Sequence, residues 1–325
     1  MNIIRWGIIG CGDVCEVKSG PAFYKTEHSE LIAVMRRDAE KAKDFAQRHH
    51  VKKWYTDAQS LINDSDVDIV YIATPPNTHK QYAIDVMKAG KPVYVEKPMA
   101  LNYDECIEML RVSQETGQKL FTAFYRRALH YFLKIKELIN SNAIGDILSV
   151  DIRQYCAPKI SDFNPDTHTW RVKKEIAGEG YFFDLAPHAL DMLDFLLGEI
   201  ENVKSFAANR GGLYDVKDTI SAVLQFKSGV QGNIQYCFVS PKAAETEYAQ
   251  ITGTRGCIRF GIFSFAPIQL ITDKGSESFT FPRPEHIQQP LIEAIVNELR
   301  GIEKCPSTAE NGIRTAQILD MLVNV

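Results

Sequence analysis

The sequence predicts an α/β protein: a doubly wound parallel sheet in the N-terminal part, followed by an α+β domain with a large, mostly antiparallel, open-faced sheet. Strand-like runs alternate with helical patterns up to about Phe124, which is typical of a parallel sheet, and strands follow strands beyond it. The chain has 325 residues, more than one hydrophobic core usually serves. We therefore expect domains over residues 1–123 and 124–325, with the last helix packing back near the boundary.

In the first domain, short apolar runs predict strands at Ile3–Ile9, Leu31–Met35, Lys53–Tyr55, Asp68–Ala73, Pro92–Glu96 and Lys119–Phe124. Helical patterns between them cover Ala39–Arg48, Thr78–Lys88 and Tyr103–Glu115. Gly90 and Gly117 follow the last two patterns, where helices commonly end. Gly20-Pro21 should end the first helix early.

In the second domain, helices are expected over Tyr131–Ser141 and Asp184–Leu197, and Pro187 is tolerable in the latter because it would lie in the first turn. A strand is predicted at Ile147–Tyr155. Hairpin-like turns then separate strands at Thr219–Phe226, Val230–Val239, Glu245–Thr252 and Cys257–Phe260. Helices over Gln289–Arg300 and Thr308–Val323 close the chain.

Composition restricts the partners. Hydrophobic and charged residues make up 45% and 24% of the chain, as in ordinary globular proteins, and the net charge of −4 predicts neither a nucleic-acid nor a membrane partner. Seven dispersed cysteines favour a reducing compartment, and no leader or bilayer-spanning stretch is visible, so we expect a cytoplasmic protein. Ligand spacing typical of zinc is missing, so we expect no metal.

The segment Gly7–Cys15 reads G-I-I-G-C-G-D-V-C and ends the first predicted strand. Its glycines permit a tight turn and let backbone N–H groups approach a pyrophosphate, while the following helix N-terminus adds partial positive charge. A glycine pattern also fits a plain strand-to-helix turn. Because this one opens a βαβ pattern, it predicts a Rossmann-type dinucleotide site that includes Gly10, Gly12, Asp13 and Val14.

The end of the second strand bears on the choice of cofactor. NAD enzymes place an acid there to accept a hydrogen bond from the ribose 2′-hydroxyl, whereas this chain has Arg36 and Arg37. A guanidinium can bind a 2′-phosphate through two N–H groups. The alternative is a solvated strand end in which Asp38 caps the next helix. We expect NADP, with NAD possible.

Two segments carry residues suited to catalysis. Lys97, in Glu96-Lys97-Pro98, follows a strand whose carboxyl end should face a ligand, although a solvated loop lysine would look the same. Asp184 and His188 follow Gly178-Glu179-Gly180 and stand four residues apart, so their side chains share one helix face. A histidine beside a carboxylate can move protons near neutral pH, although the pattern taken alone is better explained by a helix cap and an ordinary helical histidine, which occur in many proteins.

Together these motifs resemble the glucose–fructose oxidoreductase / inositol dehydrogenase / rhizopine-catabolism (Gfo/Idh/MocA) family. The resemblance rests on E-K-P after the fifth strand and on glycines followed by D-x-x-x-H. It also rests on A-T-P-P-N-T-H over residues 73–79 and on Trp170-Arg171, and it runs the whole length of the chain. The order of these pieces is more specific than any one of them.

The resemblance implies an NAD(P)-dependent oxidoreductase that moves hydride between nicotinamide and a sugar, inositol or related hydroxy or keto compound. His188 would exchange the hydroxyl proton, Lys97 would stabilise the oxygen and Asp184 would bind a hydroxyl or orient the site, so that Asp184 and His188 also contact substrate. Further residues implied are Thr74, Pro75, Asn77, His79, Glu96 and Lys97 toward the cofactor, and Tyr125, Arg126, Arg127, Trp170 and Arg171 toward the substrate. Family members often have Gly-Gly-Gly at 178–180, and a side chain at Glu179 could crowd or reshape the substrate mouth.

Two other functions fit the motifs: a glycoside hydrolase that retains NAD and works by transient oxidation and elimination, and a non-catalytic NADP sensor. Arg36 argues mildly against the first, and the pair Lys97 and His188 argues against the second. In the family, the open face of the C-terminal sheet commonly forms a subunit interface. Alternate residues of Val230–Val239 predict such an apolar face and hence a homodimer or homotetramer: Val230, Gly232, Ile234, Tyr236 and Phe238.

Overall fold

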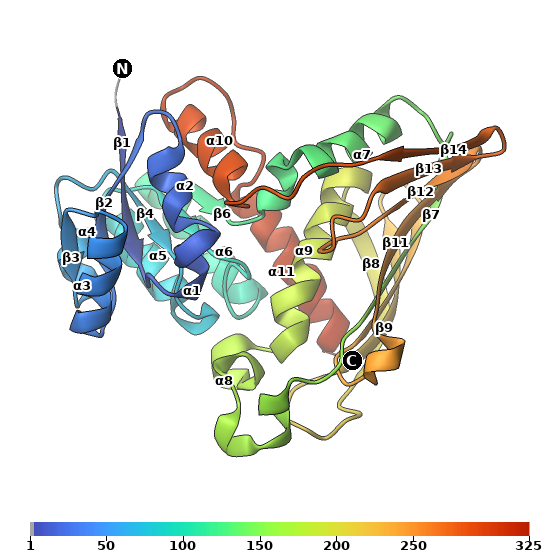
Figure 1. Cartoon of the computed structure of the whole chain (residues 1–325), viewed down its shortest axis with the longest axis horizontal. Helices are drawn as coiled ribbons and strands as arrows, with labels where there is room; N and C mark the ends of the chain where they lie inside the picture. Colours follow the sequence, from blue (N-terminus) through green and yellow to red (C-terminus); the bar gives the residue numbers. More distant parts are fainter. Residues whose placement is uncertain (1–2, 325) are drawn as a thin grey trace. The chain divides into compact units, whose positions relative to one another are not determined.

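The computed structural model describes residues 3–324 and divides into two compact units (Figure 1). The first unit comprises the chain up to Ala128 together with Pro284–Ile313, and the second comprises Leu129–Arg283 and the chain from Arg314 onward. Helix α10 (Gln289–Leu299), which the sequence analysis placed in the second domain, thus belongs to the first unit. Its apolar side is buried and it packs against helix α2 (Gly20–Lys25).

The first unit is built on a six-stranded parallel sheet in the order β3-β2-β1-β4-β5-β6. This order and the uniformly parallel pairing define a Rossmann-type, doubly wound sheet and confirm the predicted fold class. The strands are β1 (Ile4–Ile9), β2 (Ser29–Met35), β3 (Lys53–Tyr55), β4 (Ile69–Ile72), β5 (Val93–Val95) and β6 (Leu120–Thr122). Its remaining helices are α1 (Asp13–Val17), α3 (Ala39–Arg48), α4 (Ala58–Ile62), α5 (His79–Lys88) and α6 (Tyr103–Thr116).

The first helix is interrupted before Gly20, as Gly20-Pro21 predicted. A side chain at Gly20 would meet the carbonyl oxygen of Cys15, since an added Cβ would lie 2.1 Å from it. Carbonyl groups freed by the break find donors in the segment before α10. His286 Nδ1 lies 2.7 Å from the oxygen of Val17, and the amide of Gln288 donates to the oxygen of Lys18 at 3.2 Å.

The second unit is built on an eight-stranded sheet in the order β14-β13-β12-β11-β7-β10-β9-β8. Strands β7 and β10 are parallel and the other neighbours are antiparallel, which confirms the mostly antiparallel sheet. The strands are β7 (Ile147–Tyr155), β8 (Ile200–Ala208), β9 (Thr219–Phe226), β10 (Gln231–Cys237), β11 (Thr246–Gly253), β12 (Gly256–Phe260), β13 (Ile268–Thr272) and β14 (Gly275–Phe279). Helices α7 (His130–Asn140), α8 (Lys174–Ala177) and α9 (Gly180–Leu197) belong to this unit, and α11 (Ala309–Val323) ends in it.

The apolar set proposed for the open face of this sheet faces the opposite way. Gly232, Ile234, Tyr236 and Phe238 are buried, and the ring of Tyr236 lies 5.3 Å from Phe182 of helix α9. The prediction of the face was therefore wrong. Apolar side chains lie where a helix covers them because burial removes their surface from water, and the alternate, more polar residues of β10 are left on the open face.

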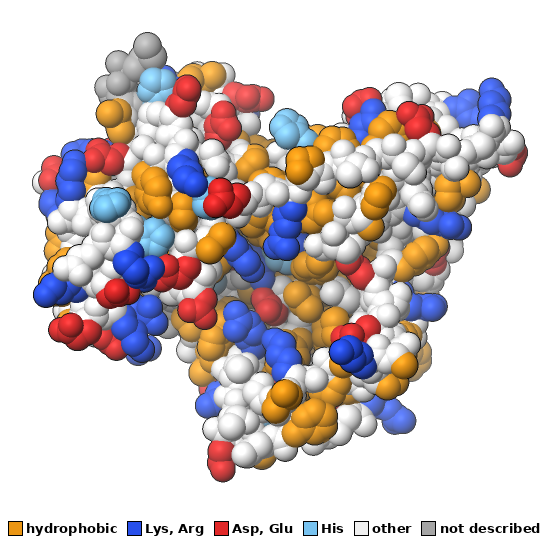
Figure 2. Space-filling model, in the orientation of Figure 1, with side chains coloured by type: hydrophobic (Ala, Val, Ile, Leu, Met, Phe, Trp, Pro, Cys, Tyr) orange, Lys and Arg blue, Asp and Glu red, His pale blue; other side chains and the backbone are white. Residues whose placement is uncertain are grey.

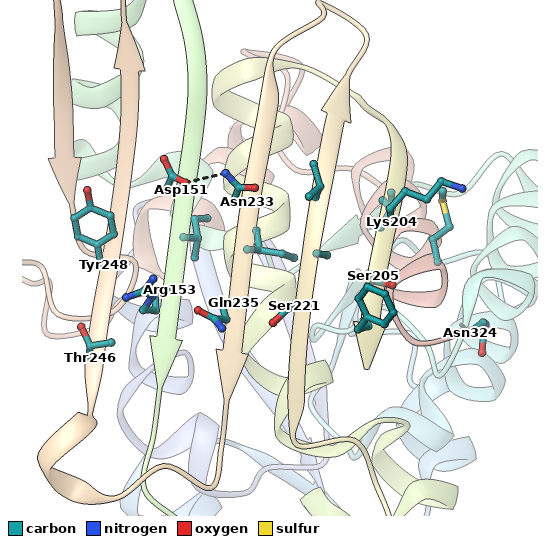
Figure 3. A pocket seen from close by; sticks show the side chains of 17 residues that line it. Asp151, Arg153, Lys204, Ser205, Ser221, Asn233, Gln235, Thr246, Tyr248 and Asn324 are labelled. Atoms are coloured by element: carbon teal, nitrogen blue, oxygen red, sulfur yellow. Dashed lines mark hydrogen bonds between the residues drawn. The ribbon is translucent and has the colours of Figure 1, made fainter. Parts of the chain in front are cut away.

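The open face is hollowed and of mixed polarity (Figure 3). It encloses about 1100 Å³ and is lined by residues of β7, β8, β9, β10, β11 and α11. Asn233 donates to Asp151 across two of these strands at 3.0 Å, while the ring of Phe206 is 86% exposed. Among residues 3–324, no helix has both the length and the apolar character needed to cross a membrane.

Helix α9 begins at Gly180 rather than at the predicted Asp184. Asp184 is consequently not its cap, and Pro187 lies inside the helix instead of in its first turn. The earlier start has a packing reason: Tyr181, Phe182 and Phe183 are all buried as helical residues. Their burial compensates for the backbone hydrogen bond that Pro187 cannot donate.

Candidate functional site

The glycine turn after β1 packs directly on the turn after β4. Gly10 has a φ of +90°, and an added Cβ would lie 2.7 Å from Thr74 Cγ2, so both backbone conformation and space require glycine. Gly12 differs, because the nearest atom to its added Cβ is the oxygen of Gly10 at 3.9 Å. Gly12 is followed by Asp13 and Val14, the first two residues of α1. Asp13 is exposed and Val14 is half-buried. The turn thus has the open backbone that a pyrophosphate requires.

Arg36 lies beside this turn. Its Nη1 donates to the carbonyl oxygen of Cys11 at 3.3 Å, which holds the guanidinium at the carboxyl end of β2. Arg37 next to it is exposed. Asp38, the first acid after the strand, caps α3 by accepting from the amide of Lys41 at 3.1 Å. The acid is engaged in the helix cap, and cationic groups occupy the end of the strand.

His79 joins the turns after β4 and β5. Its ring is fully buried, with Nε2 2.7 Å from the oxygen of Thr74 and Nδ1 2.9 Å from the oxygen of Pro98. Burial lowers its pKa, while the hydrogen bonds to the carbonyl oxygens of Thr74 and Pro98 act in the opposite direction. The structure therefore places His79 beneath these turns as a support, whereas Pro75 is half-buried and Asn77 is exposed.

Glu96 lies at the carboxyl end of β5 and is buried in a polar network. Its Oε1 accepts from Tyr71 Oη and from Gln288 Nε2, both at 2.6 Å, and its Oε2 accepts from the amide of Lys97 at 3.1 Å. Gln288 Oε1 in turn accepts from Tyr94 Oη at 2.8 Å. A carboxylate with several donors is stable in the interior because its lost hydration is replaced.

The two tyrosines act as donors in this network. Burial, reinforced by the nearby Glu96 carboxylate, raises the pKa of Tyr71 and of Tyr94 well above the usual range. Both phenols therefore stay protonated, as the hydrogen bonds require. The network holds the backbone immediately before Lys97, whose side chain is half-buried and whose peptide bond to Pro98 is cis. Tyr71, Tyr94 and Gln288 were not among the predicted site residues.

Tyr125, Arg126 and Arg127 form a short 3₁₀ turn in the first unit, and all three side chains are buried. The Arg126 guanidinium lies 4.9 Å from the centre of the Tyr125 ring. The two arginines are therefore interior residues and not solvated surface side chains. A guanidinium over the face of an aromatic ring is stabilised by a cation–π interaction, which partly replaces the hydration lost on burial.

In the second unit, Asp184 and His188 lie one turn apart on α9. Arg171 Nε lies 3.3 Å from Asp184 Oδ2, and the Arg171 guanidinium stacks 4.5 Å from the centre of the Trp170 ring. Four residues predicted from separate motifs are thus brought together by the 3₁₀ turn Trp170–Val172 and helix α9. Since Asp184 and Arg171 are both partly exposed, the pair can still exchange partners with a ligand.

His188 is buried and contacts an aromatic ring that the sequence analysis did not single out. Phe263 meets it edge-on, with ring centres 5.6 Å apart, and the Phe263 amide donates to Glu247. This contact limits rotation of the imidazole. Phe263 lies in a loop after β12, where neither a motif nor a periodic pattern marks it.

Glu179 does not project as the sequence analysis expected. Its side chain is 8% exposed, Oε2 accepts from the amide of Lys217 at 2.9 Å, and Oε1 pairs with Lys174 at 2.7 Å. The carboxylate is therefore tied to neighbouring backbone and is not available to crowd a substrate mouth. Among residues 3–324, no group of three or more His, Cys, Asp or Glu side chains could hold a metal ion.

Comparison with known proteins places these residues in context. A family profile described as "Oxidoreductase family, NAD-binding Rossmann fold" matches residues 4–124, and the "GFO/IDH/MocA C-terminal domain" matches residues 132–259. The chain is 40% identical to Oxidoreductase P35 of Formosa agariphila, over 98% of both chains. It is 30% identical to mouse (Mus musculus) trans-1,2-dihydrobenzene-1,2-diol dehydrogenase, covering 86% of this chain and 80% of that one.

Among solved structures, levoglucosan dehydrogenase in complex with NADH and L-sorbose superposes with a TM-score of 0.88 at 23% identity, covering 100% of this chain and 96% of that one. This likeness shows the shared fold. Two family profiles together match most of the chain, and a relative of high identity spans nearly all of it. The protein therefore belongs to the Gfo/Idh/MocA family of NAD(P)-binding oxidoreductases.

Proposed function

We propose that this oxidoreductase transfers hydride between a nicotinamide cofactor and a carbon bearing the hydroxyl or keto group of a sugar, inositol or related compound. The chain belongs to this family and carries two groups of residues suited to the reaction, one on each unit. This observation carries the proposal. Lys97 follows a carboxylate held by three donors, and Asp184 and His188 follow one another on one helix.

The nicotinamide, when bound, supplies or accepts the hydride. The side chains provide the remaining chemistry. The imidazole of His188 takes the hydroxyl proton during oxidation and returns it during reduction. The ammonium of Lys97 stabilises the negative charge that develops on the same oxygen, and Asp184 binds a neighbouring hydroxyl or orients the site.

The residues fit a dinucleotide. Gly10 and Gly12 give the pyrophosphate access to backbone N–H groups, with Asp13 and Val14 opening the following helix. The turns that carry Thr74, Pro75, Asn77 and Lys97 would line the cofactor, and His79 and Glu96 would hold those turns from beneath.

We further propose that the cofactor is NADP. Arg36 lies next to the glycine turn, Arg37 is exposed beside it, and Asp38 is already used as a helix cap. A guanidinium at this place binds a 2′-phosphate, whereas a 2′-hydroxyl would find no acid to accept its hydrogen bond.

The named relatives support a polyhydroxylated substrate. They include a dihydrodiol dehydrogenase, a 1,5-anhydro-D-fructose reductase of Ensifer adhaerens and levoglucosan dehydrogenase. Trp170, Arg171, Tyr125, Arg126 and Arg127 are the proposed substrate-side residues. Trp170 offers an apolar ring and the partly exposed Arg171 offers hydrogen-bond donors. A sugar can pack its C–H face on such a ring and accept hydrogen bonds from such donors.

Purified protein should be incubated with NADPH or NADH and a panel of keto sugars and keto inositols, and with NADP⁺ or NAD⁺ and the corresponding alcohols. We expect net, stoichiometric oxidation or reduction of free cofactor together with the reduced or oxidised carbohydrate. Glycoside cleavage without net cofactor turnover would instead identify a hydrolase that retains its nucleotide. Nucleotide binding without turnover of any CH–OH or carbonyl compound would identify a sensor.

For the assembly, we propose a homodimer, alone or as the unit of a tetramer, formed through the open face of the second unit's sheet. The hollow face in Figure 3 combines the exposed ring of Phe206 with Tyr248 and with the charged residues Asp151, Arg153 and Lys204. A second copy presents the same surface, with acidic and basic residues on each, so a two-fold interface can bring an acid of one copy to a base of the other. We place the enzyme in the cytoplasm because all seven cysteines, which lie among residues 3–324, are free thiols.

A further inference from the structure

The Glu179 carboxylate joins three segments of the second unit. It accepts from the backbone amide of Lys217 at 2.9 Å and pairs with the ammonium of Lys174 at 2.7 Å. The two side chains of this ion pair differ in exposure: that of Glu179 is 8% exposed and that of Lys174 is 66% exposed. Water can therefore replace the ammonium, whereas the part-buried amide of Lys217 has the largely buried Glu179 carboxylate as its acceptor.

The turn around Glu179 is tightly enclosed. Gly180 has a φ of +61°, and an added Cβ would lie 2.5 Å from Val216 Cγ2. On the other side, Gly178 has a φ of +65°, and its added Cβ would lie 2.6 Å from the ring of Phe183. The turn is thus pressed between the segment that carries Lys217 and the first turn of its own helix.

The segment that receives Glu179 is itself anchored. Asp218, next to Lys217, is fully buried and accepts from the amides of Arg210 at 2.8 Å and Gly211 at 2.7 Å. It leads directly into strand β9, which begins at Thr219. The hydrogen bond from Lys217 therefore ties the turn before α9 to a fixed point at the end of the sheet.

Helix α9 begins immediately after Glu179, with Gly180, and carries Asp184 in its second turn and His188 one turn later. The carbonyl of Glu179 accepts the amide of Phe183 at 3.5 Å, the first bond of the helix. Arg171, which pairs with Asp184, also lies against this turn, since its oxygen is 3.5 Å from the Cβ position of Gly180. A shift of the turn would therefore move both Asp184 and its partner.

We propose that Glu179 is a positioning residue, which sets the start of helix α9 through the Lys217 amide and thereby fixes Asp184 and His188 for proton transfer. The proposal rests on the function proposed above for those two side chains. It gives a reason for a glutamate between two glycines: the carboxylate supplies an anchor that a third glycine would lack.

The test compares Glu179→Gln, Glu179→Ala and Lys174→Met in the full-length protein. Glutamine keeps an acceptor oxygen for the Lys217 amide, alanine removes it, and Lys174→Met removes the exposed ammonium alone. With the substrate identified by the screen, Glu179→Ala should lower kcat roughly tenfold or more through misplacement of the proton-transfer group, with a smaller change in cofactor Kd. Its pH profile should also shift, because the surroundings of His188 change.

Glu179→Gln and Lys174→Met should stay within roughly threefold of the wild-type kcat, since both preserve the amide's acceptor. Wild-type kcat and an unchanged pH profile in Glu179→Ala would overturn the proposal. So would a glutamine variant as impaired as the alanine variant, because the effect would then follow the charge and not the hydrogen bond to Lys217.

Amide hydrogen exchange gives a readout that needs no substrate. The amides of residues 181–186 should exchange faster in Glu179→Ala than in wild type, and at the wild-type rate in Glu179→Gln. Unchanged protection in the alanine variant contradicts the anchoring. Faster exchange in that variant, combined with a wild-type protein that turns over no CH–OH or carbonyl compound, supports the anchoring and overturns the proposed function instead.

Discussion

Gln288 donates from Nε2 to Oε1 of Glu96 at 2.6 Å, although 192 residues separate them in the sequence. Through this bond, a segment near the C-terminus of the chain holds the carboxylate that precedes Lys97. Gln288 also accepts from Tyr94, so its amide uses a donor and an acceptor at once. The turn that carries the proposed catalytic lysine is therefore completed only when residues 284–313 pack in the first unit.

Replacing Gln288 by methionine, of similar length, should lower the free energy of unfolding by about 2 kcal/mol, because a buried carboxylate and a phenol each lose a partner. Urea denaturation of the two proteins measures the difference. Gln289→Met, at the half-buried neighbouring position, is the control and should change stability much less. Equal stability of wild type and Gln288→Met would show that the network does not hold the turn.

Replacing Arg36 by alanine should weaken NADPH binding roughly tenfold to a hundredfold and leave NADH binding nearly unchanged, because only NADPH carries the 2′-phosphate. Fluorescence titration with both nucleotides measures the two Kd values. Lys41→Ala, which removes a nearby exposed cation of α3, serves as the control. Equal affinity of the wild-type protein for the two nucleotides, unaffected by Arg36→Ala, would contradict the NADP assignment.

Acid should weaken the packing of the first helix. Hydrogen bonds from Arg48 lower the pKa of Glu16 from 4.5 to about 2, with a further contribution from His49. Because the folded pKa lies below the unfolded one, the ion pair's stabilisation is complete above pH 4.5 and is lost as the pH falls toward 2. About a third of the Glu16 side chain is exposed, so screening reduces the contribution to about 1 kcal/mol.

The free energy of unfolding, measured against pH, should therefore fall less steeply between pH 4.5 and 2 in Glu16→Gln than in wild type. Glu40→Gln removes an exposed acid from the first turn of α3 and should reproduce the wild-type slope. If the Glu16→Gln and wild-type curves run parallel, the carboxylate does not contribute as described.

Phe206→Asp should dissociate the proposed dimer, because it places a charge in the middle of an interface that loses an apolar ring. Light scattering coupled to size-exclusion chromatography gives the mass. Ile302→Asp, at an exposed apolar residue of the first unit, is the matched control and should keep the wild-type mass. A wild-type monomer, or a dimer unaffected by Phe206→Asp, would exclude this face.

The alternation of strand and helix patterns predicts most elements because local periodicity reports which side of each is buried. Helix Ala39–Arg48 and strands Ile147–Tyr155 and Thr219–Phe226 have the predicted bounds. Strand β8 was missed, since each of its residues is half-buried or exposed and its alternation is weak. The faces of β10 were exchanged because a period of two shows which residues share a face but not which face a helix covers.

The residues of the candidate site also differ in whether the sequence reveals them. Gly10, Lys97 and His188 stand in short motifs, so sequence alone marks them. Gln288 and Phe263 stand in no motif, and only the folded chain brings them to Glu96 and His188. The sequence suggested that the Glu179 side chain reaches the substrate mouth, but the structure buries it, and the backbone amide that donates to its carboxylate lies 38 residues away in the sequence. Long-range hydrogen bonds leave no periodic pattern.

Figure 2 shows acidic and basic side chains intermixed over the face of the first unit that it presents. This face therefore has no broad region of one charge sign that would attract a charged ligand, and recognition depends on the individual charged residues of the site. Lys97 and His188 are the two residues on which the proposed chemistry depends.

The most direct test measures hydride transfer by Lys97→Met and His188→Gln, with NADPH and the carbonyl substrate identified by the screen. Each variant should bind the nucleotide and keep the wild-type circular dichroism, yet lose roughly a hundredfold or more in kcat/KM, because oxyanion stabilisation and proton transfer each supply a factor of that order. Turnover at the wild-type rate in either folded variant would contradict the assignment of the reaction to these two side chains.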